Sequence, residues 1–148
     1  MSTFNIPGDY GYVVIVSALI SFQCALSSLA VSGLRRSMNV PYPDSGDGRY
    51  AAKLTDLQWE QFHNAQRAHR NYTEQIGITQ SLLITGGLIA PRSSAVAGLL
   101  YMIGRQFYYH GYVNHGPSGR FKGAILLDIG LLGLLGVALY SGFILLGF

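Results

Sequence analysis

The chain has 148 residues, the length of one ordinary domain, but its composition is not that of a soluble one. Charged residues make up 11% of the chain and hydrophobic residues 49%, whereas a soluble domain averages about 25% charged residues. With a net charge of only +3, the composition excludes a soluble fold, whose surface would lack polar cover, and a disordered chain, which would be rich in charge. A membrane protein remains. Four helical spans of about 20–25 residues would leave little room for a separate soluble domain.

The first long apolar run covers residues 10–34 and is long enough to cross a bilayer. Asp9 precedes the run, and Arg35 and Arg36 end it. A signal peptide carries its positive charge before its apolar core. The observed order therefore predicts a retained membrane anchor.

A polar loop is expected over residues 37–59, which are rich in Pro, Gly, Ser and Asp, before a long second helix. Thr55 and Asp56 are both good N-cap residues, so the helix is expected to start there. Its first part is polar. Its second part, residues 76–90, is apolar up to Pro91, where the helix is expected to break.

Two further apolar segments predict a third span, which starts after Ser93 and Ser94, and a fourth, in which Lys122 and Asp128 are the only charges. Residues 114–119 between them are expected to form a loop. Short connections between four helices predict an all-α membrane protein with an up-down bundle. The expected spans, in one domain over residues 1–148, are residues 10–34, 62–90, 95–113 and 121–147.

The positions of the basic residues predict the orientation in the membrane. Six of the ten Lys and Arg residues lie between the first span and the apolar part of the second, Arg120 and Lys122 flank the third loop, and only Arg92 lies in the second loop. Cytoplasmic loops carry an excess of Lys and Arg. Loops one and three are therefore expected in the cytoplasm, with both termini and loop two opposite. The six residues are Arg35, Arg36, Arg49, Lys53, Arg67 and Arg70.

Two groups of polar side chains have helical spacing. Arg67, Asn71 and Glu74 lie at i, i+4 and i+7 and share one face of the second helix. Ionisable groups at membrane depth normally face the bundle interior or a wet cavity, so a polar pocket is expected at the cytoplasmic end. The third helix contributes a matching stripe, Tyr101, Arg105, Tyr108 and Tyr112, and the same end is bordered by Arg35, Arg36 and Arg120.

The chemistry of this pocket favours a small zwitterion with several carboxylates. A guanidinium fork recognises a carboxylate through two hydrogen bonds, Glu74 can hold an amino group, and Asn71 can hold an amide. Glutathione, with two carboxylates, an α-amine, two amides and a thiol, fits this description. No metal is expected, because no HxxxH or CxxC pattern occurs and His110 and His115 have no partner at metal-ligand spacing.

Structural roles are the alternative for several of these residues. Arg67 and Glu74 would pair across two turns and only stabilise the bundle. Arg35 and Arg36 would serve as topology signals, and Tyr112 as an interfacial anchor.

Arg105 is harder to explain in this way, because it lies well inside the third span. Asp128 is interpreted either as its neutralising partner or as an acid at the headgroup level.

Residues 62–74, FHNAQRAHRNYTE, and residues 104–112, GRQFYYHGY, resemble two signatures of the membrane-associated proteins in eicosanoid and glutathione metabolism. Three positions depart from the family pattern: Gly77 replaces a usual proline, Gln75 replaces the aromatic of leukotriene synthases, and Arg70 adds a charge. Within the family the first signature is most similar to that of microsomal glutathione S-transferase type 3, through Arg67, Ala68, His69, Asn71 and Glu74.

The resemblance implies a homotrimer in the endoplasmic reticulum membrane, with glutathione as co-substrate between neighbouring subunits and no metal. It implies a transferase or peroxidase that acts on a lipophilic electrophile or a lipid hydroperoxide, without a nucleic-acid partner. Arg120 matches the thiol-activating arginine of the family across a one-residue gap. A guanidinium stays protonated, so Arg120 would stabilise the thiolate as a fixed charge. The implied glutathione-binding residues are Arg35 or Arg36, Arg67, His69, Asn71, Glu74, Arg105, Tyr108 and Tyr112.

Three other functions are considered. One is a non-catalytic protein of the same fold that binds lipid and activates a partner, and another is a conjugating enzyme like leukotriene C4 synthase. A small multidrug transporter would need a carboxylate in the first span, which residues 10–34 lack.

Overall fold

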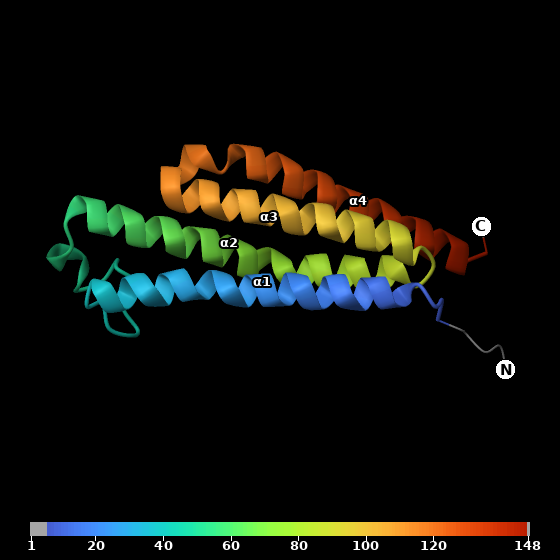
Figure 1. The fold of residues 1–148 in the computed structure, drawn as a ribbon, viewed down its shortest axis with the longest axis horizontal. Helices are drawn as coiled ribbons and strands as arrows, with labels where there is room; N and C mark the ends of the chain where they lie inside the picture. The colour runs from blue at the N-terminus through green and yellow to red at the C-terminus, as the bar shows by residue number, and fades with distance from the viewer. Residues whose placement is uncertain (1–5, 148) are drawn as a thin grey trace.

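The computed structural model describes residues 6–147, which form four long helices and one short 3-10 helix. Successive long helices run in opposite directions, and the start of the first helix and the end of the last lie at the same end of the bundle (Figure 1). The long connection between the first two helices lies at the other end. The elements are α1 (Tyr10–Ser37), η1 (Ala51–Lys53), α2 (Asp56–Gly87), α3 (Pro91–Gly119) and α4 (Phe121–Leu145).

The helices α2 and α3 pack against each other and form the middle of the bundle, with α1 and α4 on opposite sides of them (Figure 1). Much of the outer surface is apolar: Phe121 is 70% exposed, and Val96 and Leu132 are each 66% exposed. Within the described residues, α1 and α4 are long and apolar enough to cross a membrane. The helices α2 and α3 do not reach this level of hydropathy, because their polar stripes lower the mean value.

The start of α2 confirms the predicted N-cap. The Thr55 hydroxyl accepts a hydrogen bond from the Gln58 backbone N–H at 3.3 Å, and the Gln58 side chain accepts one from the Thr55 N–H at 3.0 Å. Such reciprocal capping fixes the first turn of a helix. The cap therefore fixes the residue at which the long loop ends and the polar half of α2 begins.

The ends of α3 differ from the sequence prediction. The helix begins at Pro91 and not after Ser94, because a proline at the first helical position loses no hydrogen bond. The predicted loop over residues 114–119 is correct only in part. Helical structure continues past Asn114, but it is interrupted at Gly116, where φ is 67°, a positive value that glycine tolerates. Residues 117–119 form one helical turn after this kink, and Gly119 packs back against Gly111.

Close packing of α3 on α4 depends on glycine. A Cβ atom at Gly123 would meet the backbone of Tyr108, and one at Gly130 would lie 2.5 Å from the Tyr101 backbone nitrogen. Small residues let membrane helices approach in this way. The contact places the start of α4 directly beside the polar stripe of α3.

Gly123→Ala should therefore destabilise the protein by about 1–3 kcal/mol, because the added methyl group has no space. Thermal unfolding in detergent micelles measures the effect. Gly136→Ala is the matched control, since no atom outside its own helix lies within 4 Å of the place that the added methyl group would occupy. Equal unfolding temperatures for the two variants would contradict the proposed packing role.

Candidate functional site

Arg105 is the centre of a buried polar layer between α2 and α3, and only 1% of its surface is exposed. Its Nε donates to the Tyr101 hydroxyl at 2.8 Å, and its Nη1 donates to the Asn71 side-chain oxygen at 2.7 Å. Its Nη2 donates to the Asn71 carbonyl at 3.3 Å and to the Gln75 side-chain oxygen. The guanidinium thus fixes the position of Asn71.

Aromatic rings complete the surroundings of this guanidinium. Its central carbon lies 4.9 Å from the ring centre of Tyr72, 5.1 Å from that of Tyr101 and 5.5 Å from that of Tyr108. No carboxylate pairs with Arg105 within residues 6–147. Asp128, interpreted above either as its neutralising partner or as an acid at the headgroup level, is exposed on α4 and forms no ion pair with Arg105, so the first of these alternatives is wrong. Neutral oxygens and ring faces surround the charge instead.

Arg120 lies beside the same stripe, at the junction of α3 and α4. Its Nη1 donates to the Tyr108 hydroxyl at 3.3 Å, and its guanidinium lies 5.6 Å from the centre of the Tyr112 ring. The hydrogen bond and the nearby Tyr108 oxygen raise the pKa of Arg120 above its ordinary value. Arg120 is exposed, so a cation that remains charged is presented to the outside of the bundle.

The stripe on α2 lies partly on the outer face of the bundle. Arg67 and Glu74 are exposed, whereas Asn71 is half-buried against Arg105. Arg67 and Glu74 form no ion pair with each other or with other described residues, so the alternative of a purely structural pair is wrong. A cavity of about 590 Å³ at the end of the bundle that carries the long loop is lined by Asp56, Trp59, Glu60, His63, Asn64, Arg67, Tyr112 and Pro117.

Comparison with known families agrees with this geometry. The MAPEG family model matches residues 13–140, nearly the whole chain. The chain belongs to the MAPEG family. Members of this family are membrane proteins that include glutathione transferases and peroxidases as well as non-catalytic proteins. The two motifs and the polar layer that they form thus belong to a MAPEG chain.

The two arginines at the end of α1 have different surroundings in this MAPEG protein. Arg35 is buried and donates to the backbone carbonyls of Val40 at 3.1 Å, Pro41 at 3.2 Å and Asp44 at 2.6 Å. Arg36 is exposed. The structure therefore uses Arg35 to hold the long loop and leaves Arg36 on the surface.

His69 faces away from the other α2 candidates. Its Nδ1 lies 2.7 Å from the Ser27 hydroxyl of α1. It is thus on the side of α2 that packs against α1, whereas Arg67 and Glu74 are exposed. The fold of the chain does not bring the His69 side chain together with those of Arg67 and Glu74.

The sequence analysis missed three polar residues of this layer. Gln75 accepts from Arg105, and the Tyr72 hydroxyl donates to the Gln23 side-chain oxygen at 2.6 Å. Gln75 follows Asn71 by four residues, so helical spacing alone would have placed it one turn further along the same stripe. Gln23 has no comparable signal, because it stands alone in an apolar run. Among the described residues, no group of three or more His, Cys, Asp or Glu side chains is placed to hold a metal ion.

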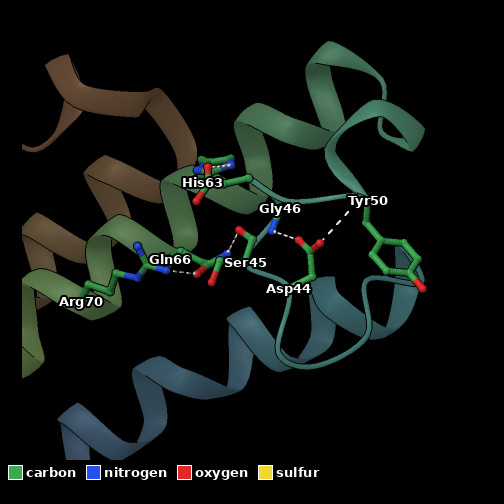
Figure 2. Close-up of polar contacts among 8 residues, drawn as sticks. Asp44, Ser45, Gly46, Tyr50, His63, Gln66 and Arg70 are labelled. Atoms are coloured by element: carbon green, nitrogen blue, oxygen red, sulfur yellow. Dashed lines mark hydrogen bonds and ion pairs between the residues drawn. The ribbon is translucent and has the colours of Figure 1, made fainter.

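The long loop is fastened to α2 through side chains (Figure 2). The Gln66 amide donates to the Ser45 carbonyl at 2.6 Å, and Arg70 donates to the Gln66 oxygen at 3.1 Å. His63 lies 3.2 Å from an Asp47 oxygen. The additional charge at Arg70 therefore supports the residue that holds the loop.

Asp44 organises the loop itself. Its carboxylate accepts hydrogen bonds from the Gly46 N–H at 2.7 Å and the Tyr50 N–H at 3.3 Å. Partial desolvation raises the pKa of Asp44, but the N–H groups of Gly46, Tyr50 and Gly48 and the charge of Arg35 together lower it below the ordinary value of 3.8. The ionised form is thus the one that the folded loop favours.

Because the folded pKa of Asp44 is the lower one, its stabilising effect is present above the ordinary pKa and is lost as the pH falls through the folded value. Hydrogen exchange over residues 44–50 should accelerate between about pH 5 and about pH 3, after correction for intrinsic rates. Asp44→Asn should show fast exchange already at the higher pH. Asp56→Asn is the control, and an unchanged loop in Asp44→Asn would contradict the role of the carboxylate.

Proposed function

We propose that this MAPEG protein is an integral-membrane glutathione transferase or peroxidase that activates the glutathione thiolate for attack on lipophilic electrophiles or lipid hydroperoxides. The observation that carries this proposal is the set of exposed charges around the buried layer. Arg67 and Glu74 flank Asn71, which Arg105 holds in place. On the neighbouring helices, Arg120 presents its cation beside Tyr108 and Tyr112.

These groups match the parts of glutathione. Arg67 would bind a carboxylate, Glu74 the α-amine and Asn71 an amide, and the other proposed binding residues are Arg36, Tyr108 and Tyr112. Arg105 would not bind glutathione directly but would hold Asn71 in position through its hydrogen bonds. His69 and Arg35 would reach glutathione only if a neighbouring subunit presented them.

Arg120 is the proposed activating residue. A free thiol has a pKa of about 8.5, and the thiolate is the nucleophile. A fixed cation beside the sulfur favours the anion, and the thiol proton leaves to solvent. In the transferase reaction the sulfur forms a C–S bond as the leaving group departs with its electron pair. In the peroxidase reaction the sulfur attacks the outer oxygen of the hydroperoxide, so that an S–O bond forms as the O–O bond breaks, and the departing alkoxide takes up a proton to become the alcohol. A second glutathione thiol then attacks this oxidised sulfur, which forms the disulfide and releases the oxygen as water.

The membrane placement follows the same proposal. All four helices would span the endoplasmic reticulum membrane as a single domain, with loops one and three in the cytoplasm. The face that carries Arg67 and Glu74 is open in the single chain. Charges at membrane depth need polar surroundings, so a homotrimer with glutathione between subunits would enclose them.

Among transferases, the chain is proposed to be nearest to microsomal glutathione S-transferase type 3, because Arg67, His69, Asn71 and Glu74 follow that pattern. A leukotriene C4 synthase-like enzyme is less favoured, since Gln75 replaces the aromatic residue and is occupied by Arg105. A non-catalytic lipid-binding protein would not need the exposed charges of Arg67 and Arg120.

Addition of glutathione to the purified protein tests the proposal through the ultraviolet absorbance of the thiolate. A thiolate signal, with turnover of a lipid hydroperoxide or an aryl halide, is the expected result. A panel of hydroperoxides, aryl halides and epoxide fatty acids would identify the substrate class. Absence of both the thiolate signal and turnover would leave the non-catalytic function.

Arg67→Ala should weaken glutathione binding about tenfold, because a charge-assisted hydrogen bond to a carboxylate is lost. Calorimetric titration measures the affinity. Arg49→Ala, a change in an exposed loop arginine, is the control. Unchanged affinity in Arg67→Ala would remove this residue from the site.

A further inference from the structure

A basic and aromatic surface lies where α1 meets the long loop. A cavity of about 490 Å³ between the last turn of α1 and the loop includes Arg36 in its lining, and a cavity of about 600 Å³ includes Arg49. The two cavities share Pro41, Tyr42 and Tyr50 as lining residues, so they are neighbouring parts of one surface. Lys53 adjoins it, since its ammonium lies 4.6 Å from the centre of the Tyr50 ring. We call this surface the loop patch and define it as Arg36, Pro41, Tyr42, Arg49, Tyr50 and Lys53.

The loop patch lies at the depth of the lipid headgroups. The apolar run of α1 covers residues 10–34 and rises about 37 Å, more than the ~30 Å of the hydrocarbon core. The residues that directly follow this run are therefore outside the hydrocarbon region. Tyr42 is 76% exposed, and exposed aromatic rings are typical of the membrane–water interface. The patch thus borders the phosphate layer of the adjacent leaflet.

Positive charge exceeds negative charge on this surface. Residues 35–53 contain four basic residues and two acidic ones, Asp44 and Asp47. Both acids are engaged within the fold, because Asp44 accepts two backbone N–H groups of the loop and Asp47 lies 3.2 Å from a histidine of α2. The exposed cations form no ion pair among residues 6–147, so the patch favours an anionic partner. These cations are Arg36, Arg49 and Lys53.

A buried arginine in the wall of the first cavity has a donor without an acceptor. Arg35 is only 9% exposed and lines this cavity. All three of its hydrogen bonds come from Nη1, whereas its Nε has no acceptor among residues 6–147. Its guanidinium lies 4.2 Å from the centre of the Tyr42 ring. The charge of Arg35 therefore adds to that of Arg36 in attracting an anion to the cavity.

We propose that the loop patch binds the headgroup of one phospholipid that carries a net negative charge. Its phosphodiester lies in the first cavity beside Arg36, since a guanidinium binds a phosphate through two hydrogen bonds. The rest of the headgroup extends over Tyr42 toward Arg49 and Lys53. Clusters of basic residues directly after a membrane span are typical of such binding.

The bound lipid has a structural role and does not react. It holds the long loop on the membrane surface, and the loop in turn is fastened to α2 by Gln66. An acidic protein segment would meet the same positive charges. The position of the patch directly beyond the hydrocarbon core favours a lipid over such a segment.

Native mass spectrometry of the unaltered, glutathione-free protein from mixed micelles of phosphatidylserine and phosphatidylcholine tests the proposal. One phosphatidylserine per chain should be retained in preference to phosphatidylcholine, because only phosphatidylserine has a net negative charge. In nanodiscs, phosphatidylserine should slow hydrogen exchange over residues 41–53 but not over residues 88–92, at the other end of the bundle. Since glutathione and electrophile are absent, failure of this test leaves the proposed enzyme function unaffected, and failure of turnover leaves the loop patch unaffected.

Paired variants locate the effect. Arg49→Gln with Lys53→Gln should lower the preference for phosphatidylserine about 30-fold, the expected loss for two cations near an anionic surface. Neither residue is a proposed glutathione group, whereas Arg36 is one and stays unaltered. The matched control is Arg92→Gln with Lys122→Gln, which removes the same charge at two other exposed positions and should keep the preference.

Three results would overturn the proposal. Equal retention of phosphatidylcholine would show that the charge of the headgroup is not recognised. Equal losses of preference in the two double variants would show that net charge, and not the loop patch, attracts the lipid. Equal protection of residues 41–53 by glycerophosphoserine, which has the headgroup but no acyl chains, would assign the patch to a soluble anion.

Discussion

Arg120→Ala should abolish most of the thiolate absorbance of bound glutathione and lower kcat about 10²–10³-fold, the usual effect of losing one group that stabilises a developing anion. Affinity for glutathione should change little, because Arg67, Asn71 and Glu74 remain. The reason is positional: Arg120 is exposed at the α3–α4 junction and is held by Tyr108, away from the groups proposed to bind the peptide. Thiolate absorbance and steady-state kinetics measure the two effects separately.

Two controls define this experiment. Lys122→Ala removes an exposed cation two residues away and should leave the thiolate signal intact. Tyr108→Phe removes the hydroxyl that orients Arg120 and should give a smaller loss of the signal than Arg120→Ala. If Arg120→Ala keeps full activity, the activating charge belongs to Lys122 or Arg105.

Most of the fold was predictable because long apolar runs with flanking charges indicate membrane helices. The cap at Thr55 and the start of α1 at Tyr10 follow from local chemistry that the sequence displays. The break at Gly116 lies within the predicted loop, but the helical turn of residues 117–119 after it was not predicted, since Pro117 and Gly119 also fit an ordinary loop. Packing of Gly119 against Gly111 stabilises this turn, and that contact is not a local property.

The candidate site was predictable as two stripes but not as a network. Helical spacing placed Arg105 and Asn71 on facing stripes, and the structure joins them. The partner of the buried charge was not predictable, because an acid such as Asp128 is the expected neutraliser and neutral oxygens of Asn71 and Gln75 take that place. Spacing within one helix says nothing about which face a neighbouring helix covers.

The same limit explains the outcomes for Arg35 and His69. Both are close in sequence to candidates that are exposed as expected, such as Arg36 and Arg67. The Arg35 side chain nevertheless points toward backbone carbonyls of the long loop, and the His69 side chain points toward Ser27. Only the path of the long loop and the packing of α1 decide these directions. A sequence motif therefore does not predict the direction in which each of its side chains points.

Arg105→Met should have the largest effect on stability, a loss of about 3 kcal/mol or more. The methionine preserves length and apolar contact but leaves the buried oxygens of Tyr101, Asn71 and Gln75 without their donor, and each such group costs about 1–3 kcal/mol. Asn71 would also lose the contact that orients it. Thermal unfolding in micelles should shift strongly, and glutathione affinity should fall together with it.

Arg105→Lys separates charge from geometry. An ammonium keeps the positive charge but cannot reach four acceptors in the plane of a guanidinium fork, so this variant should remain clearly less stable than the unaltered protein. Arg92→Met is the matched control on the same helix, because its ion pair with Asp9 is largely exposed and exposed pairs contribute about 0–1 kcal/mol. Equal stability of Arg105→Lys and the unaltered chain would show that charge alone suffices. Equal losses in Arg105→Met and Arg92→Met would show that the buried layer does not hold α2 against α3.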